Sequence, residues 1–282
     1  MAEKESTQAP PAGKWFSGRN VIVTGASSGI GRDIAETFAS MGARVTLLAR
    51  REKMLDELAQ KIRSEGGTAL PIMCDVTSES DVRRSIDHAN RVHGNVDILI
   101  NNAGVSIPSK IAEMNAADLR RMMDVNFFGT VYATQAALPT MLKAGRGNIV
   151  NVASLAGRRG VSPLGGYCAT KFAVVGFTEA LRVELFGTGV SASLVMPGLI
   201  DTPMIKEFEG SPIPSGVAMP ARWVTWGVLA AVTMGLAEID VPFGSATAEK
   251  LASLFPDMAG SLLGLGSRML EYLSGWTGFS VR

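Results

Sequence analysis

The residues VIVTGASSGIG, numbers 21–31, join a short β-branched run directly to a turn that contains three glycines. The run predicts a buried strand, and residues 29 to about 41 predict a helix after it. Glycine suits a turn whose backbone takes a positive φ or approaches a phosphate closely. A helix that begins there directs free N–H groups and its positive dipole end at an anion. An ordinary tight turn also uses glycines, but this strand–turn–helix context favours a dinucleotide-phosphate loop.

The alternation of apolar strands and helices continues outward from this turn. Further strands are expected at residues 44–49, 69–73, 97–100, 148–152, 191–195 and 239–241, and helices at 52–65, from 78, at 115–143 and at 220–237. Strands that alternate with crossover helices form a parallel sheet covered on both faces. The expected fold is therefore α/β, a single domain with a Rossmann-like, doubly wound parallel sheet of about seven strands. Ligands bind such sheets at the carboxyl ends of the strands.

Composition narrows the class of protein. Of 282 residues, 46% are hydrophobic and 19% charged, which is enough apolar material for a large core. The net charge of +1 gives no reason to expect a nucleic-acid partner. Two cysteines, Cys74 and Cys168, suggest no disulfide framework and favour a reducing, cytoplasmic location. No Cys/His cluster has metal-ligand spacing, so no metal is expected, and His88 and His93 are expected at the surface.

A dinucleotide-binding catalytic domain is expected at 18–245, with a tail before it, a substrate lid within it and an extension after it. Residues 1–17 lack the apolar core of a signal peptide and are expected to form a flexible tail. The proline-containing stretch 201–220 is long for a connection and is expected to form a substrate lid. Residues 246–282 are expected to form a helical extension that packs on a subunit or on the core. Membrane-surface contact is not favoured, because this extension has few basic residues, and no apolar run reaches the roughly 20 residues of a membrane span.

Two arginines after the second expected strand predict the coenzyme. In dinucleotide folds an acid at this place binds the ribose hydroxyls of NAD, whereas an arginine accommodates the 2′-phosphate of NADP. Arg50 and Arg51 stand there without an acid, and Arg32 adds a positive charge after the glycine turn. Both arginines would also suit the start of a solvated helix. The pattern favours NADP (NADPH) over NAD.

Together, the motifs of the chain resemble those of the short-chain dehydrogenase/reductase family. The resemblance rests on TGASSGIG at 24–31, Asp75-Val76, NNAG at 101–104, Asn126, Ser154, YCATK at 167–171 and Pro197-Gly198, and it runs from about residue 20 to 202. It implies a nicotinamide coenzyme, a small ketone or alcohol as substrate, and assembly into a homodimer or homotetramer.

The expected catalytic residues are Asn126, Ser154, Tyr167 and Lys171. Tyr167 and Lys171 are four residues apart on a helix and therefore share one face. The lysine ammonium is expected to lower the pKa of the tyrosine from about 10, so that the phenol exchanges a proton with the substrate oxygen. Ser154 follows the fifth strand, where its hydroxyl can donate to a developing oxyanion. The resemblance implies that Lys171 also bonds the nicotinamide ribose and that Asn126 holds a water in a proton relay.

The resemblance also assigns residues to the coenzyme. Asp75 is expected at the adenine, residues 101–104 beside the adenine ribose, and the segment 197–202 along the nicotinamide. The complete expected set is Gly25, Ser27, Ser28, Gly29, Ile30, Gly31, Arg50, Arg51, Asp75, Val76, Asn102, Ala103, Gly104, Tyr167, Lys171, Pro197, Gly198, Ile200 and Thr202.

These expectations define a leading function and its alternatives. The leading function is an NADPH-dependent oxidoreductase that reduces a ketone or aldehyde to an alcohol by reversible hydride transfer. Apolar residues of the expected lid, such as Met204 and Met219, favour a lipophilic substrate, for example a 3-oxoacyl or steroid-like ketone. The alternatives are an NAD(P)-dependent alcohol dehydrogenase working in the oxidative direction, and a non-catalytic NADP-binding sensor or scaffold.

Overall fold

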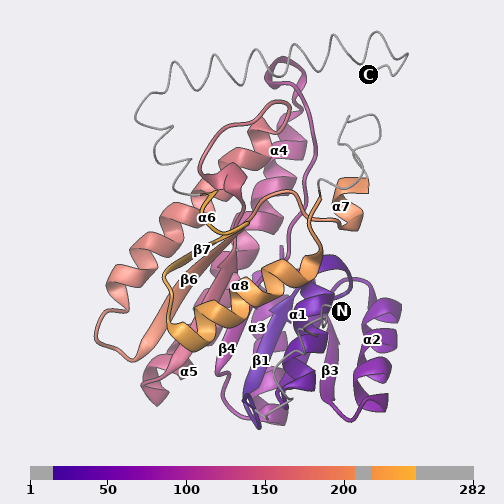
Figure 1. Cartoon of the computed structure of the whole chain (residues 1–282), viewed down its shortest axis with the longest axis vertical. Coiled ribbons are helices and arrows are strands. Elements are labelled where there is room, and N and C mark those ends of the chain that lie inside the picture. Colours follow the sequence, from indigo (N-terminus) through magenta and orange to yellow (C-terminus); the bar gives the residue numbers. More distant parts are fainter. Residues whose placement is uncertain (1–14, 207–217, 246–282) are drawn as a thin grey trace, which may run out of the picture.

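The computed structural model describes residues 15–206 and 218–245 of the chain, which form one sheet with helices on both sides (Figure 1). The expected tail as far as residue 14, most of the expected lid and the expected C-terminal extension lie outside the described residues.

Seven parallel strands form the sheet. Their bounds are β1 Asn20–Thr24, β2 Arg44–Ala49, β3 Thr68–Met73, β4 Ile98–Asn101, β5 Gly147–Val152, β6 Val190–Pro197 and β7 Glu238–Val241. Their spatial order is β3-β2-β1-β4-β5-β6-β7, so that β1 lies beside β4 although β2 and β3 separate them in the chain. Loops diverge at such a reversal and leave the crevice in which doubly wound folds bind ligands. The sheet confirms the predicted fold class.

Helices cover both faces of this sheet. The α-helices of the described residues are α1 Gly29–Ser40, α2 Glu52–Ser64, α3 Glu79–His93, α4 Ala116–Met123, α5 Gly129–Ala144, α6 Gly165–Glu184, α7 Pro203–Lys206 and α8 Ala221–Met234. One face packs on α1, α2 and α8 and buries Val21 and Val23, whereas the other packs on α3, α5 and α6 and buries Ile22 (Figure 1). β1 is thus buried on both faces, which explains its uninterrupted apolar sequence.

Helix α3 begins where the sequence predicts, but its last residue, His93, is not at the surface as expected. The Ser78 hydroxyl caps α3 and accepts a hydrogen bond from the backbone N–H of Asp81 at 3.3 Å. His93 is only 7% exposed, so the expectation of a surface residue is wrong. The physical reason is that the buried stripe of α3, which includes Ile86 and Ala89, continues onto the same face at His93. Burial lowers the pKa of His93 below its ordinary value.

The helical region expected at 115–143 is divided into three elements. α4 ends at Met123 and α5 begins at Gly129, with a π-helical turn, Asp124–Phe128, between them. Such turns are rare, and they occur often at functional sites. This one contains Asn126, one of the expected catalytic residues.

A buried chain of polar side chains joins the middle of the sheet to α6. The amide nitrogen of Asn101 donates to the side-chain oxygen of Asn151 at 2.8 Å. The amide nitrogen of Asn151 donates in turn to the hydroxyl of Thr178 at 2.8 Å. Since unpaired buried polar groups are costly, these bonds favour one arrangement of β4, β5 and α6.

Cysteines and histidines form no reactive cluster in the part of the chain that the structure describes. Cys74 and Cys168 are both free and buried. Among the described residues, no group of three or more His, Cys, Asp or Glu side chains is arranged to hold a metal ion. Within 15–206 and 218–245, no helix is both long and apolar enough to cross a membrane.

Candidate active site

The glycine turn after β1 lies tightly against the segment that follows β4. Gly25 has a φ of +67°, and a Cβ atom there would lie 2.8 Å from the Cα atom of Ala103. A Cβ atom at Gly31 would lie 2.4 Å from the carbonyl oxygen of Gly25 and 2.5 Å from the amide nitrogen of Asn102. Neither position can hold a side chain without moving the other segment.

Hydrogen bonds fix these two segments to each other. The Thr24 hydroxyl oxygen accepts from the backbone N–H groups of Asn102 and Ala103, both at 3.0 Å. The Asn102 side-chain amide donates back to the carbonyl of Thr24 at 3.0 Å. The glycine turn and the NNAG segment therefore form one unit at the switch point. The sequence analysis did not single out Thr24, although this threonine begins the TGASSGIG motif.

The N-terminus of α1 has the properties of an anion site. Ser28 is its N-cap but makes no side-chain capping bond, and the first turn contains no acidic residue. The backbone N–H groups at the start of the helix and its dipole are therefore directed at any phosphate that enters the crevice.

The segment after β6 borders the same turn. A Cβ atom at Gly29 would lie 3.3 Å from the Cγ2 atom of Thr202, so these residues are neighbours. The Gly198 N–H donates to the carbonyl of Val241 at 2.7 Å and holds the start of this segment against β7. Ile200, expected beside the nicotinamide, follows in this segment, and its side chain is buried in the core.

Arg51, one of the residues expected to bind the coenzyme, lies against the glycine turn. Its guanidinium donates to the hydroxyl of Ser27 at 2.8 Å and to that of Ser28 at 2.6 Å. Arg32, by contrast, pairs with Glu36 at 3.0 Å on its own helix. The positive charge beside the two serines thus comes from Arg51, which precedes α2, rather than from α1.

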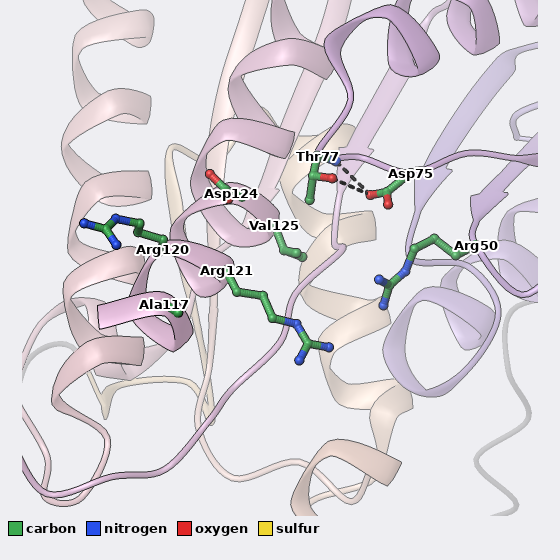
Figure 2. A pocket seen from close by; sticks show the side chains of 8 residues that line it. All are labelled: Arg50, Asp75, Thr77, Ala117, Arg120, Arg121, Asp124 and Val125. Atoms are coloured by element: carbon green, nitrogen blue, oxygen red, sulfur yellow. Dashed lines mark hydrogen bonds between the residues drawn. The ribbon is translucent and has the colours of Figure 1, made fainter. Parts of the chain in front are cut away.

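Arg50 borders a cavity of about 340 Å³ next to this turn. The cavity is lined by Arg50, Asp75, Thr77, Ala117, Arg120, Arg121, Asp124 and Val125 (Figure 2). One oxygen of the Asp75 carboxylate accepts from the N–H and the hydroxyl of Thr77, at 3.0 and 2.9 Å, which leaves its other oxygen for a ligand. Val76 does not line the cavity, because its side chain is buried against Gly129.

Ser154 and Tyr167 lie together at the carboxyl edge of the sheet. Ser154 follows β5 and caps the 3₁₀ turn Leu155–Gly157, whereas Tyr167 lies in the first turn of α6. The Ser154 hydroxyl donates to the carbonyl of Pro197 at 3.3 Å, and it lies close enough to the Tyr167 hydroxyl to act on the pKa of the phenol. Two hydroxyl groups that were expected to share one substrate oxygen are therefore adjacent.

Lys171 is placed one turn further along α6 than Tyr167. Its side chain is buried, with Nζ 5.6 Å from the centroid of the Tyr167 ring. The ammonium donates to the carbonyl of Val152, the last residue of β5, at 3.0 Å. A Cβ atom at Gly104 would lie 3.8 Å from Nζ and 3.4 Å from Oδ1 of Asn126, so these groups surround one small space.

Asn126 pins the π-helical turn to the segment after β4. Its Oδ1 accepts from the N–H of Val105 at 2.8 Å, and its Nδ2 donates to the carbonyl of Val105 at 2.9 Å. Nδ2 also donates to the hydroxyl of Thr170 at 2.9 Å. Thr170 was missed by the sequence analysis, because a threonine within a helix carries no signal of such a contact.

Burial changes the pKa values of the two central groups in opposite directions. Loss of hydration raises the pKa of Tyr167 to about 12, although the nearby Ser154 hydroxyl acts in the lowering direction. Loss of hydration lowers the pKa of Lys171 to about 8. The expected lowering of the pKa of Tyr167 is therefore wrong for the protein by itself. The phenol keeps its proton at neutral pH, while the lysine is still mostly charged.

Comparison with known proteins identifies the family. The sequence profile of the short chain dehydrogenase family matches residues 19–211. An uncharacterised oxidoreductase of Staphylococcus epidermidis is 40% identical over 189 residues, which are 66% of this chain and 79% of that protein. The ketoacyl reductase HetN of Nostoc sp. is 36% identical over 185 residues, which are 66% of this chain and 64% of that protein.

The fold is also similar to that of a solved member of the family. A short chain dehydrogenase/reductase from Burkholderia phymatum, in complex with NAD, superposes with a TM-score of 0.78 at 26% identity and covers 86% of this chain and 95% of that chain. The chain belongs to the short-chain dehydrogenase/reductase family. It is an oxidoreductase of the class that binds a nicotinamide coenzyme and acts on a small molecule.

Replacing Gly31 by alanine tests the close approach of the two segments. Because the new methyl group would overlap the Gly25 carbonyl, we expect Gly31→Ala to cost about 1–3 kcal/mol of stability and to weaken coenzyme binding. Thermal unfolding and a titration of coenzyme fluorescence measure the two effects. Gly176→Ala is the control, since a Cβ atom on that face of α6 meets nothing within 4 Å. Unchanged binding by Gly31→Ala would contradict the argument.

The buried ammonium of Lys171 predicts a pH-dependent stability. Its pKa falls from 10.5 to about 8 on folding, so between these values the unfolded chain binds more protons and stability rises with pH. From about pH 7 to about pH 9.5 we expect wild type to gain roughly 1–2 kcal/mol relative to Lys171→Met. Urea unfolding at both pH values measures the stability of wild type relative to Lys171→Met. The same relative stability at both pH values would show that burial does not lower the pKa of Lys171.

Proposed function

We propose that the protein is an NADPH-dependent reductase that converts a ketone or aldehyde into an alcohol. The observation that carries this proposal is the pair of hydroxyl groups of Tyr167 and Ser154 at the switch-point edge of the sheet. A phenol that keeps its proton at neutral pH is suited to donate that proton to a carbonyl oxygen, which is the reductive direction.

Each group of this set has a distinct role in the proposed mechanism. A bound dihydronicotinamide supplies the hydride. The Ser154 hydroxyl orients the carbonyl oxygen, and Tyr167 gives its proton to that oxygen as negative charge develops. Lys171, charged at neutral pH, stabilises the phenolate that is left behind. The free lone pair of Asn126 Oδ1 is the acceptor that this side chain has left for a relay water.

The preference for NADPH is supported by the arginines after β2. Arg51 is bonded to both serines of the glycine turn, and Arg50 borders the adjoining cavity with Asp75. A guanidinium binds a phosphate through two parallel hydrogen bonds, and no acid replaces these arginines. The Burkholderia relative was solved with NAD, so membership of the family does not by itself select NADPH. The proposal for this chain therefore rests on the charge of the two arginines.

A lipophilic substrate is the second part of the proposal. The ends of the 201–220 segment are joined by hydrogen bonds: the N–H of Met219 donates to the carbonyl of Leu199 at 2.9 Å, and the N–H of Asp201 donates to that of Met219 at 2.8 Å. The joined ends of this segment support the proposal that it is a substrate lid. With the ketoacyl reductase of Nostoc among the relatives, a 3-oxoacyl or steroid-like ketone is the proposed class.

The assembly and location of the protein belong to the same proposal. Phe128, at the end of the π-helical turn, and Phe172 on α6 are large apolar side chains that are 40% and 46% exposed. Apolar groups on two adjacent elements support a homodimer or homotetramer that covers them. The buried, free cysteines support a cytoplasmic location.

Removing the phenol hydroxyl separates binding from turnover. We expect Tyr167→Phe to bind NADPH as wild type does but to lose about a hundred- to ten-thousand-fold in kcat, because the proton donor is missing. NADPH absorbance, followed over ketones of graded size and polarity, gives kcat. Tyr132→Phe on α5 is the control. A sensor or scaffold would keep its biological output in Tyr167→Phe, and a wild type that reduces none of these ketones would contradict the proposal.

Reversing the charge at position 50 tests the coenzyme. We expect Arg50→Asp to weaken NADPH about ten- to a hundredfold and to leave NADH affinity unchanged or improved, since only NADPH carries the 2′-phosphate. Fluorescence titrations give both dissociation constants. Arg83→Asp, which changes the net charge equally on the distant helix α3, should bind both coenzymes as wild type does. Equal affinities in the wild-type protein would refute the NADPH preference.

A further inference from the structure

Two arginines from different elements face each other across the cavity beside the glycine turn. Figure 2 shows the side chains of Arg50, which follows β2, and Arg121, on α4, extending toward each other. Arg120 also borders the cavity, but its guanidinium points to the opposite side of α4. The space between Arg50 and Arg121 is within the size range of small-molecule sites, since the cavity has a volume of about 340 Å³.

The arginines of this cavity outnumber its two carboxylates, and the two that face each other make no ion pair with them. Neither Arg50 nor Arg121 forms an ion pair with any residue in 15–206 or 218–245. Of the two carboxylates that line the cavity, Asp75 is bonded to Thr77, and Asp124 points away from the two guanidinium groups (Figure 2). Two cations that face each other repel, and an anion between them removes that repulsion.

Helix α4 is held in a fixed position relative to the coenzyme crevice. Val125, four residues after Arg121, is buried and lines the same cavity. The next residue, Asn126, anchors the π-helical turn to Val105 through two hydrogen bonds. Arg121 is therefore presented from an element that is tied to the NNAG segment, and not from a free surface loop.

We propose that Arg121 is a further coenzyme-binding residue, which grips the adenosine 2′-phosphate together with Arg50. This inference rests on the proposed NADPH preference and adds a second, opposite cation to it. Guanidinium groups suit this role because each can form two parallel bonds to a phosphate. Arg121 is specific for the phosphate in this assignment, and it contributes little to the rest of the coenzyme.

Calorimetric titration with two short ligands tests the assignment. Adenosine 2′,5′-bisphosphate carries the 2′-phosphate, and adenosine 5′-monophosphate lacks it. We expect Arg121→Gln to weaken the bisphosphate about tenfold and to leave the monophosphate within about twofold of wild type, because a charged hydrogen bond to the extra phosphate is lost. Arg121→Lys should retain part of the affinity. Arg120→Gln removes the same charge one residue earlier and should change neither ligand.

The outcomes separate this inference from the coenzyme proposal. If wild type prefers the bisphosphate and Arg50→Gln loses that preference while Arg121→Gln keeps it, NADPH stands and the role of Arg121 falls. If Arg121→Gln weakens both ligands equally, the residue contacts the adenosine and not the phosphate, which also overturns the assignment. Equal effects of Arg120→Gln and Arg121→Gln would show that only the net positive charge of α4 matters, which also overturns a specific contact between Arg121 and the 2′-phosphate. A wild type without preference for the bisphosphate refutes both proposals.

Discussion

The close contact between the glycine turn after β1 and the segment after β4 is the constraint on which the site depends. The chain leaves the neighbouring parallel strands β1 and β4 in opposite directions at this point, and the crevice for a ligand lies between the two segments. The close contact of the two backbones forms the base of this crevice. Thr24 provides the acceptor for two N–H groups of the second segment, and Gly25 and Gly31 provide the missing side chains. The start of α1 is thereby aimed into the crevice, where its dipole and free N–H groups favour phosphate.

A second unit, built from β5 and α6, is placed at the same edge. Ser154, Tyr167 and Lys171 come from two elements, and their chemistry depends on how much water each has lost. Burial stabilises the neutral form of both titratable groups, so that the phenol holds its proton more firmly and the ammonium holds it less firmly. At neutral pH this leaves a protonated phenol above a mostly charged lysine, which is the pairing that a reductase needs.

The π-helical turn between α4 and α5 connects the cavity beside the glycine turn to the sheet edge that carries Ser154 and Tyr167. The π-helical turn Asp124–Phe128 carries Asn126, which bonds Val105 and Thr170, and it also sets the last turn of α4. A side chain on α4 thus takes its position from the same bonds that hold Asn126, one of the proposed catalytic residues. This arrangement is the reason that Arg121, although exposed, is held at the cavity that it shares with Arg50.

The sequence by itself determined the sheet, the glycine turn and the identity of the polar residues at its edge, because strand and turn preferences are local and the family motifs have nearly fixed spacing. Local patterns did not reveal that His93 is buried or that a π-helical turn interrupts the helical region at 115–143. Nor did they give the sign of the pKa shift of Tyr167, since proximity to Lys171 predicts a lower value and burial raises it. Only the tertiary structure decided these points. Burial, and the direction in which a side chain faces, depend on segments distant in the chain, and the desolvation that they cause raises the pKa of the buried phenol.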